Sequence, residues 1–331
     1  MLNNKSILIT GGTGSFGKAF TRYVLENYDP KKIIIYSRDE FKQFLMQNEF
    51  KEHASKLRFF IGDVRDKERL SRAFEGVDFC VHAAALKQVP ACEYNPAEAI
   101  KTNINGAQNV IDAALDTGVK KVVARSTDKA VNPVNLYGGT KLVSDKLFVA
   151  ANAYAGSKDV CFSLVRYGNV AGSRGSVIPF FHNILKNGGT ELPITDYRMT
   201  RFWISLRQGV ELVIKALEEA RGGETFISKL PSFKITDLAQ AMLPGCEMPE
   251  VGIREGEKLH EIMVTVEDST HTYEYDKHFI VYPQMVWSDR QTVLPGGKKV
   301  AEGFSYSSGN NTQWLSVEEI KELLKTVELE K

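Results

Sequence analysis

Cysteine is scarce in this chain, and its four copies, Cys80, Cys92, Cys161 and Cys246, lie far apart. They form no C-x-x-C pair, and no histidine stands near them at metal-ligand spacing. This pattern excludes a disulfide scaffold and the usual zinc sites, so we expect reduced cysteines and no bound metal.

Long apolar runs and an excess of one charge are also missing. No stretch approaches the roughly 18 apolar residues of a membrane span, and the N-terminal MLNNKSILIT does not read as a signal peptide. The 42 Lys and Arg balance 41 Asp and Glu, so the protein has no net positive charge large enough to attract nucleic acid. We therefore expect a cytoplasmic protein without membrane or nucleic-acid partners.

The first half of the 331 residues alternates short apolar runs with segments of helical period. The runs are rich in β-branched residues, as in strands that are buried on both faces. This alternation predicts βαβ units and a doubly wound, Rossmann-type α/β fold with a parallel sheet. Strands are expected at residues 6–10, 32–37, 57–62, 79–83, 121–126 and 160–166, and helices at 16–27, 41–52, 95–117 and 137–155.

From about residue 172 the sequence becomes irregular and is punctuated by Gly and Pro. A helix near 206–220 and a strand near 224–228 resemble the first half again. We therefore predict a dinucleotide-binding domain of residues 1–170, to which 206–230 returns. The smaller α+β region, expected to bind substrate, comprises 171–205 and 231–331.

A glycine-rich turn, TGGTGSFG at residues 10–17, directly follows the first strand and opens a helix. In this context one glycine permits the turn, the next admits a pyrophosphate, and the third lets the helix pack on the strand. A merely tight βα turn is the alternative. The expected cofactor contacts in this turn are Gly11, Thr13, Gly14, Ser15, Phe16 and Gly17.

The end of the second strand indicates which dinucleotide is bound. Ser37, Arg38 and Lys42 can together satisfy a 2′-phosphate, which predicts NADP. Asp39 could instead hold a ribose hydroxyl of NAD, and the two cations could simply belong to a solvated helix start. Further along, Asp63 and Val64 are expected near adenine, although Asp63 could equally cap a helix. The small residues Ala83, Ala84 and Ala85 would admit the cofactor backbone.

Catalytic groups are expected just after the fifth strand. Tyr137 and Lys141 are four residues apart on one helix face, where the ammonium can lower the pKa of the phenol. The phenol could then take a proton from a sugar hydroxyl during hydride transfer. A lone Y-x-x-x-K occurs often by chance, but its place in this sheet favours catalysis.

The chain resembles the extended short-chain dehydrogenases/reductases, and among them the inverting UDP-N-acetylglucosamine 4,6-dehydratases. The resemblance spans essentially the whole chain and implies bound NADP, UDP-N-acetylglucosamine as substrate, a homo-oligomer and the first step of pseudaminic acid biosynthesis. The strings that carry it are SRDE (37–40), GDVRD (62–66), AAALK (83–87), STDKA (126–130), RYGNV (166–170) and GIREGEK (252–258).

Lys129 distinguishes this chain within the resemblance, because retaining relatives carry Asp-Glu where it has Asp128-Lys129. By resemblance, Tyr137, assisted by Thr127 and Lys141, would take the proton of the 4-hydroxyl of the sugar while a hydride passes from carbon 4 to NADP⁺. Lys129 would then remove the proton on carbon 5, and Asp128 would protonate the departing 6-hydroxyl. We expect the surroundings to push the Lys129 amine toward neutrality. Alternatively, this lysine only pairs with Asp128.

Substrate contacts are also implied by the resemblance, and for each of them a structural salt bridge is the alternative. Lys87 would approach the sugar, Asn169 the diphosphate, Arg201 and Arg254 the phosphates, and Glu257 the uridine ribose. Arg125 and Gly139 depart from the family pattern without removing a catalytic group. The stretch 267–299 matches the family least.

Two rival functions stay open at this stage. A nucleotide-sugar 4-epimerase or plain dehydrogenase would need Tyr137 and Lys141 but would have no use for Asp128 and Lys129. A redox-sensing regulator would bind NADP without turnover, and the intact catalytic groups argue against it.

Overall fold

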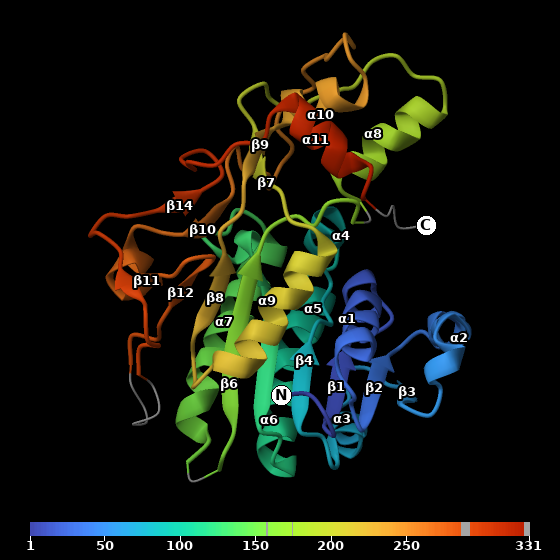
Figure 1. The fold of residues 1–331 in the computed structure, drawn as a ribbon, viewed down its shortest axis with the longest axis vertical. Coiled ribbons are helices and arrows are strands. Elements are labelled where there is room, and N and C mark those ends of the chain that lie inside the picture. Colours follow the sequence, from blue (N-terminus) through green and yellow to red (C-terminus); the bar gives the residue numbers. More distant parts are fainter. Residues whose placement is uncertain (157, 174, 286–291, 328–331) are drawn as a thin grey trace.

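A large, mainly parallel sheet organises the computed structural model, which describes residues 1–156, 158–173, 175–285 and 292–327 (Figure 1). Seven strands run parallel and three antiparallel strands continue one edge. In spatial order they are β13 (Lys298–Lys299), β11 (Thr272–Glu274), β12 (His278–Val281), β8 (Thr225–Ser228), β6 (Cys161–Tyr167), β5 (Lys121–Thr127), β4 (Phe79–His82), β1 (Ser6–Thr10), β2 (Lys32–Ser37) and β3 (Leu57–Ile61).

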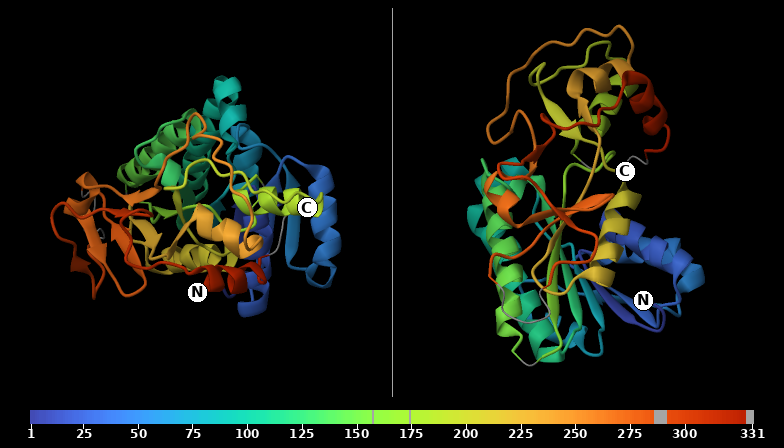
Figure 2. Two further views of the ribbon diagram at one scale, coloured as in Figure 1. Left: turned by 90° about the horizontal axis from the view of Figure 1, so that it is seen from above. Right: turned by 60° about the vertical axis from the view of Figure 1, so that its left-hand side comes forward.

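Helices cover both faces of this sheet (Figure 2). On one face α1 (Ser15–Asn27) and α9 (Leu206–Glu219) bury Phe20, Val24 and Val213 against the strands. The other face carries α3 (Lys67–Phe74), α6 (Gly106–Thr117) and α7 (Leu136–Tyr154), in a second apolar cluster. The predicted doubly wound α/β fold is therefore confirmed.

The chain forms further helices and helical turns between these elements. They are α2 (Glu40–Glu49), η1 (Lys51–His53), α4 (Val89–Tyr94), α5 (Pro96–Ile100), the π-helical turn η2 (Lys101–Asn105), η3 (Asp128–Ala130) and η4 (Glu267–His271).

The helix predicted over residues 95–117 is broken by η2. Inside this turn the buried Asn103 side chain accepts from the Leu86 amide and donates to the Leu86 carbonyl and to Thr140. It ties the loop after β4 to α7, and that tertiary demand overrides the local helical pattern.

A smaller region lies beyond the carboxyl ends of the parallel strands (Figure 1). Its own apolar cluster joins α8 (Val177–Lys186), α10 (Ile235–Met242) and α11 (Val317–Leu324). Two small sheets accompany it, β7 (Thr200–Phe202) with β9 (Ser232–Lys234), and β10 (Ile262–Val264) with β14 (Tyr306–Ser307). In the described ranges, no helix is both long and apolar enough to cross a membrane.

The two parts of the chain are interleaved. Residues 206–230 supply α9 and β8 to the large sheet. Strands β11, β12 and β13 also extend that sheet, although they come from the segment 231–331 that we assigned to the substrate-binding region. The division of roles between the two regions stays a prediction.

Two adjacent glycines in α7 face different surroundings. A Cβ on Gly138 would lie 2.1 Å from the Lys129 carbonyl oxygen, so only glycine lets α7 approach η3 this closely. A Cβ on Gly139 would meet nothing within 4 Å.

Substituting each glycine by alanine should therefore change stability in opposite directions. We expect Gly139→Ala to raise the free energy of unfolding by about 0.5–1 kcal/mol, because alanine is the better helix former. Gly138→Ala should lower it by roughly 1–3 kcal/mol, because the added methyl group collides with backbone. Urea unfolding of both variants measures this, and a shift of the same sign in both would contradict the packing described.

Candidate active site

A continuous cleft of about 2370 Å³ follows the carboxyl ends of the parallel strands and is lined from both regions. Open α/β sheets bind ligands in this crevice. Of the predicted site residues, all line the cleft except Asp128 and Lys141, whose side chains are buried. The structure thus gathers residues from positions 11 to 257 around one space.

The glycine turn has the shape that a dinucleotide needs. Gly11 has a φ of 65°, and a Cβ there would lie 3.0 Å from the Ala84 backbone. A Cβ on Gly17 would lie 2.2 Å from the Gly12 carbonyl oxygen, so α1 packs directly on the turn. Gly14 provides no side-chain cap for α1, which leaves the amides of its first turn available to an anion. These residues fit a pyrophosphate.

The residues predicted to select the dinucleotide lie at the end of β2 and the start of α2. The Asp39 carboxylate caps α2, accepting from the Lys42 amide at 2.9 Å and pairing with the Lys42 amine at 3.2 Å. Arg38 is half exposed and 3.6 Å from the carboxylate of Asp63. Asp39 and Lys42 thus bind each other at the start of α2, and Arg38 faces Asp63 beside the cleft.

The helix-cap alternative for Asp63 is not what the structure has, because Asp66 caps α3 by accepting from the Arg69 amide. Asp63 instead accepts from the amide and the guanidinium of Arg65. This pairing keeps the carboxylate in place beside the cleft.

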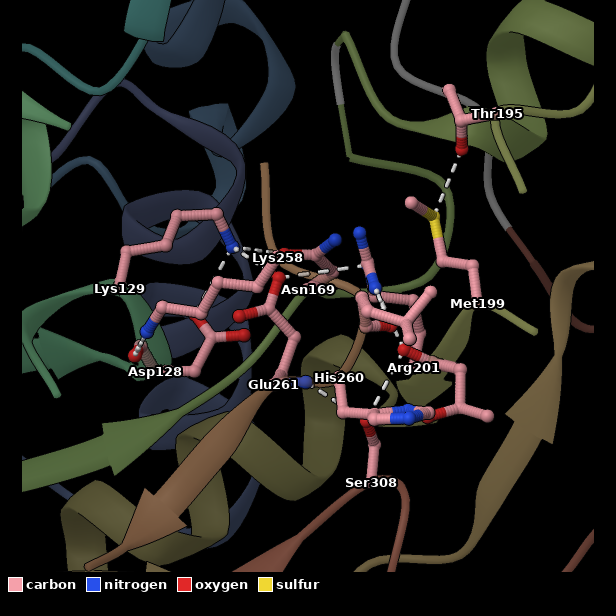
Figure 3. A network of polar contacts seen from close by, with 12 residues as sticks. Asp128, Lys129, Asn169, Thr195, Met199, Arg201, Lys258, His260, Glu261 and Ser308 are labelled. Carbon is pink, nitrogen blue, oxygen red and sulfur yellow. Dashed lines mark hydrogen bonds and ion pairs between the residues drawn. The ribbon is translucent and has the colours of Figure 1, made fainter. Parts of the chain in front are cut away.

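Asp128 and Lys129 follow the end of β5 and lie in a network of polar contacts (Figure 3). Thr127 donates to Asp128 Oδ1 at 2.8 Å, and Lys129 Nζ donates to the same oxygen at 3.1 Å. Lys129 Nζ also donates to Asn169 Oδ1 at 2.8 Å and lies 3.5 Å from Glu261 Oε1. The amine therefore lies in the cleft, between two carboxylates.

The electrostatics differ from what the sequence led us to expect for Lys129. Burial lowers the pKa of the Lys129 amine, but the carboxylates of Asp128 and Glu261 outweigh it and hold the pKa above the usual lysine value. The expected push toward neutrality is therefore wrong for the free protein, in which Lys129 is an ammonium ion.

The phenol of Tyr137 also differs from expectation. Burial raises its pKa to about 12, against the lowering effects of the Lys129 charge and of hydrogen bonding with Thr127. The Lys141 amine has a lowered pKa, because it is buried, and its charged partner is Asp145 on the same helix. Lys129, rather than Lys141, is thus the foremost cation acting on the phenol in the free protein.

Three residues at this site were not predicted from the sequence. Glu261 lies between Lys129 and Arg201, at 3.5 Å from a side-chain nitrogen of each. Lys258 donates to the carbonyl oxygens of Asp128 and Val131 and so anchors η3. Asp145 accepts from Ser126 behind Lys141. The partners of Glu261 and Lys258 are distant in sequence, so no local spacing marked these two, whereas Asp145 stands four residues after Lys141 on α7 and could have been found from that spacing.

The predicted substrate residues fall into two groups. Arg201 is buried, and its Nη1 donates hydrogen bonds to the carbonyl oxygens of Thr200 and Leu259. Lys87, Arg254 and Glu257 line the cleft. Among the described residues, Glu257 Oε2 is a buried oxygen without a hydrogen-bond partner.

No metal site accompanies these groups in the described part of the chain, where no set of three or more His, Cys, Asp or Glu side chains could hold an ion. The polar groups of the cleft are amines, guanidinium groups, carboxylates, hydroxyls and a phenol. They suit proton transfer and the binding of a phosphorylated ligand.

Comparison with known proteins gives one family and full-length relatives. The family model described as "Polysaccharide biosynthesis protein" matches residues 7–283. The chain is 58% identical over 334 residues to the UDP-N-acetylglucosamine 4,6-dehydratase (inverting) of Campylobacter jejuni, covering 99% of both chains. It is 43% identical over 335 residues to the UDP-glucose 4-epimerase of Rickettsia canadensis, covering 99% and 97%.

Solved structures share the fold. Pen from Bacillus thuringiensis matches with a TM-score of 0.90 and 39% identity, over 98% of each chain. DesIV, a dTDP-glucose 4,6-dehydratase from Streptomyces venezuelae with NAD and TYD bound, matches with a TM-score of 0.66 and 24% identity, over 77% of this chain and 86% of that one.

Proposed function

This chain belongs to the polysaccharide biosynthesis protein family, of the extended short-chain dehydrogenase/reductase type, and we propose that it is an inverting UDP-N-acetylglucosamine 4,6-dehydratase. The observation that carries the proposal is 58% identity over 99% of both chains to a relative with that printed activity. The product would be UDP-2-acetamido-2,6-dideoxy-β-L-arabino-hex-4-ulose, and the reaction is that of a hydro-lyase.

We propose that the cofactor is NADP. The Gly11 to Gly17 turn would hold the pyrophosphate, and Ser37, Arg38 and Lys42 the 2′-phosphate. When bound, the nicotinamide would supply reversible hydride transfer between carbon 4 and carbon 6 of the sugar. Because the cofactor would be regenerated in each turnover, the enzyme would need no added oxidant or reductant.

Protein side chains would handle the protons. Tyr137 takes the proton of the 4-hydroxyl, and hydrogen bonding with Thr127 favours the phenolate that this requires. The resulting 4-ketone acidifies the proton on carbon 5. Lys129 removes that proton and Asp128 protonates the departing 6-hydroxyl, so that one water leaves. Reprotonation of carbon 5 from the opposite face then inverts it.

A 4-epimerase is the second candidate, favoured by the Rickettsia relative of that name at 43% identity. An epimerase would use Tyr137 and Lys141 alone. The buried Asp128 and the cleft-facing Lys129, 3.1 Å apart, support dehydration instead. We further propose, from the resemblance, that the product enters pseudaminic acid biosynthesis and that the enzyme is a homo-oligomer.

Mass spectrometry of the product tests the activity. Purified protein incubated with UDP-N-acetylglucosamine should give a product lighter by one water. Lys129→Ala should give none and still bind cofactor, whereas Lys321→Ala, a control on α11, should behave as the wild type. An unchanged mass with the wild-type protein would refute dehydration, and normal turnover by Lys129→Ala would refute the role of that lysine.

Cofactor choice is tested by removing the Arg38 guanidinium. A charge-assisted contact is worth about 1.5–3 kcal/mol, so Arg38→Ala should weaken NADP⁺ binding roughly 10-fold or more and leave NAD⁺ binding almost unchanged. Calorimetric titration of cofactor-free protein gives both affinities. Arg72→Ala, which removes an exposed arginine outside the cleft, is the control. Equal losses for both dinucleotides would contradict the assignment.

A further inference from the structure

Glu261 is a buried carboxylate that lines the cleft and that the reaction outlined above does not use. It directly precedes β10, and its backbone is fixed by Ser308, whose Oγ accepts from the Glu261 amide at 2.9 Å and whose amide donates to the Glu261 carbonyl at 2.8 Å. Only 3% of the residue is exposed. A buried charge interacts more strongly with neighbouring charges than an exposed one, because water screens it less.

Two cations share one oxygen of this carboxylate. Lys129 Nζ and Arg201 Nε each lie 3.5 Å from Glu261 Oε1 (Figure 3). The Arg201 guanidinium also donates to the carbonyl oxygens of Thr200 and Leu259, and these hydrogen bonds fix its position beside Glu261. The second oxygen, Oε2, is buried and has no hydrogen-bond partner among the described residues. The position of the carboxylate beside the Lys129 amine is therefore built into the fold.

The charges around the Lys129 amine come from every element that packs on it. Asp128 of η3 and Glu261 before β10 are the anions, and the Tyr137 phenol approaches from α7. Arg201 of β7 and Lys258, whose own pKa is lowered by burial, oppose an ammonium at Lys129. Because these two carboxylates are the anions beside the amine, the removal of either one would leave Lys129 with a single stabilising negative charge.

We propose that Glu261 is a positioning residue that holds Lys129 as an ammonium ion, and so sets which member of the Asp128–Lys129 pair carries the proton used in dehydration. The inference rests on the proposed function. Elimination as outlined needs a neutral amine at Lys129 and a proton on Asp128, whereas in the free protein the two side chains form an ion pair at 3.1 Å.

The two states contain the same number of protons. One proton passing over the 3.1 Å contact from Lys129 Nζ to Asp128 Oδ1 converts the resting pair into the reactive one. Glu261 opposes this transfer, because it stabilises the ammonium but not the protonated carboxyl. The pair therefore stays charged until substrate binding changes the balance, and Glu261 keeps the base inactive in the free enzyme.

The reactivity of the Lys129 amine toward acetic anhydride tests this inference without turnover. Only the neutral amine reacts, so the acetylation rate at a fixed pH between 8 and 10 reports its neutral fraction. We expect Glu261→Gln, which keeps the shape and loses the charge, to raise the rate at Lys129 about tenfold or more, equivalent to at least one pKa unit. Mass spectrometry of peptides quantifies the label.

Glu274→Gln is the matched control, because it removes a carboxylate from an ion pair with Lys229 at 2.8 Å that lies outside the cleft. It should leave the Lys129 rate unchanged. A rate within twofold of the wild type in a folded Glu261→Gln protein would overturn the inference and leave Glu261 as a partner of Arg201 alone.

Should Glu261→Gln fail to fold, Glu261→Asp decides, because it keeps the negative charge but draws it back from the Lys129 amine. The acetylation rate at Lys129 should rise in this variant, while the rate at the exposed Lys321 should stay as in the wild type. An unchanged rate at Lys129 would overturn the inference. Because no substrate is present, these outcomes are independent of the water-loss assay, and either result can fail without the other.

Discussion

The ion pairs around the Lys129 amine are the constraint on which the site depends. Two carboxylates buried nearly completely, Asp128 and Glu261, would be costly in the interior unless cations compensated them. Lys129, Arg201 and Lys258 supply that compensation and become fixed in turn. The chemistry proposed for this protein is a consequence of this cluster, because the same contacts that stabilise the charges place an acid and a base at one side of the cleft.

Both regions of the chain are needed to assemble the cluster. The sheet contributes Asp128 and Lys129 where β5 passes into η3, and α7 packs closely against that turn through Gly138. The smaller region contributes Arg201 and Glu261 beside two short sheets. The interleaved chain, which returns to the large sheet through α9 and β8, holds the two regions together at the place where the sugar would react.

Local sequence was sufficient for the framework and for the cofactor turn. The runs of β-branched residues located the parallel strands, and glycines 11, 14 and 17 located the turn, because both signals are local. It was insufficient for the η2 break, which depends on Asn103 binding distant groups, and for β11 to β13, short antiparallel strands that continue one side of the sheet. It also missed Glu261, whose contacts with Lys129 and Arg201 join distant parts of the chain. It misjudged the protonation of Lys129, which depends on Glu261 as well as on the neighbouring Asp128.

The proposed exchange and inversion at carbon 5 of the sugar is the step that one measurement tests most directly. If Lys129 and its neighbours remove a proton there and another group returns one from the opposite face, then the reaction run in heavy water and followed by proton NMR must give a product with deuterium at carbon 5 and ring couplings of the L-arabino configuration. Protium retained at carbon 5, or couplings of the uninverted sugar, would contradict it.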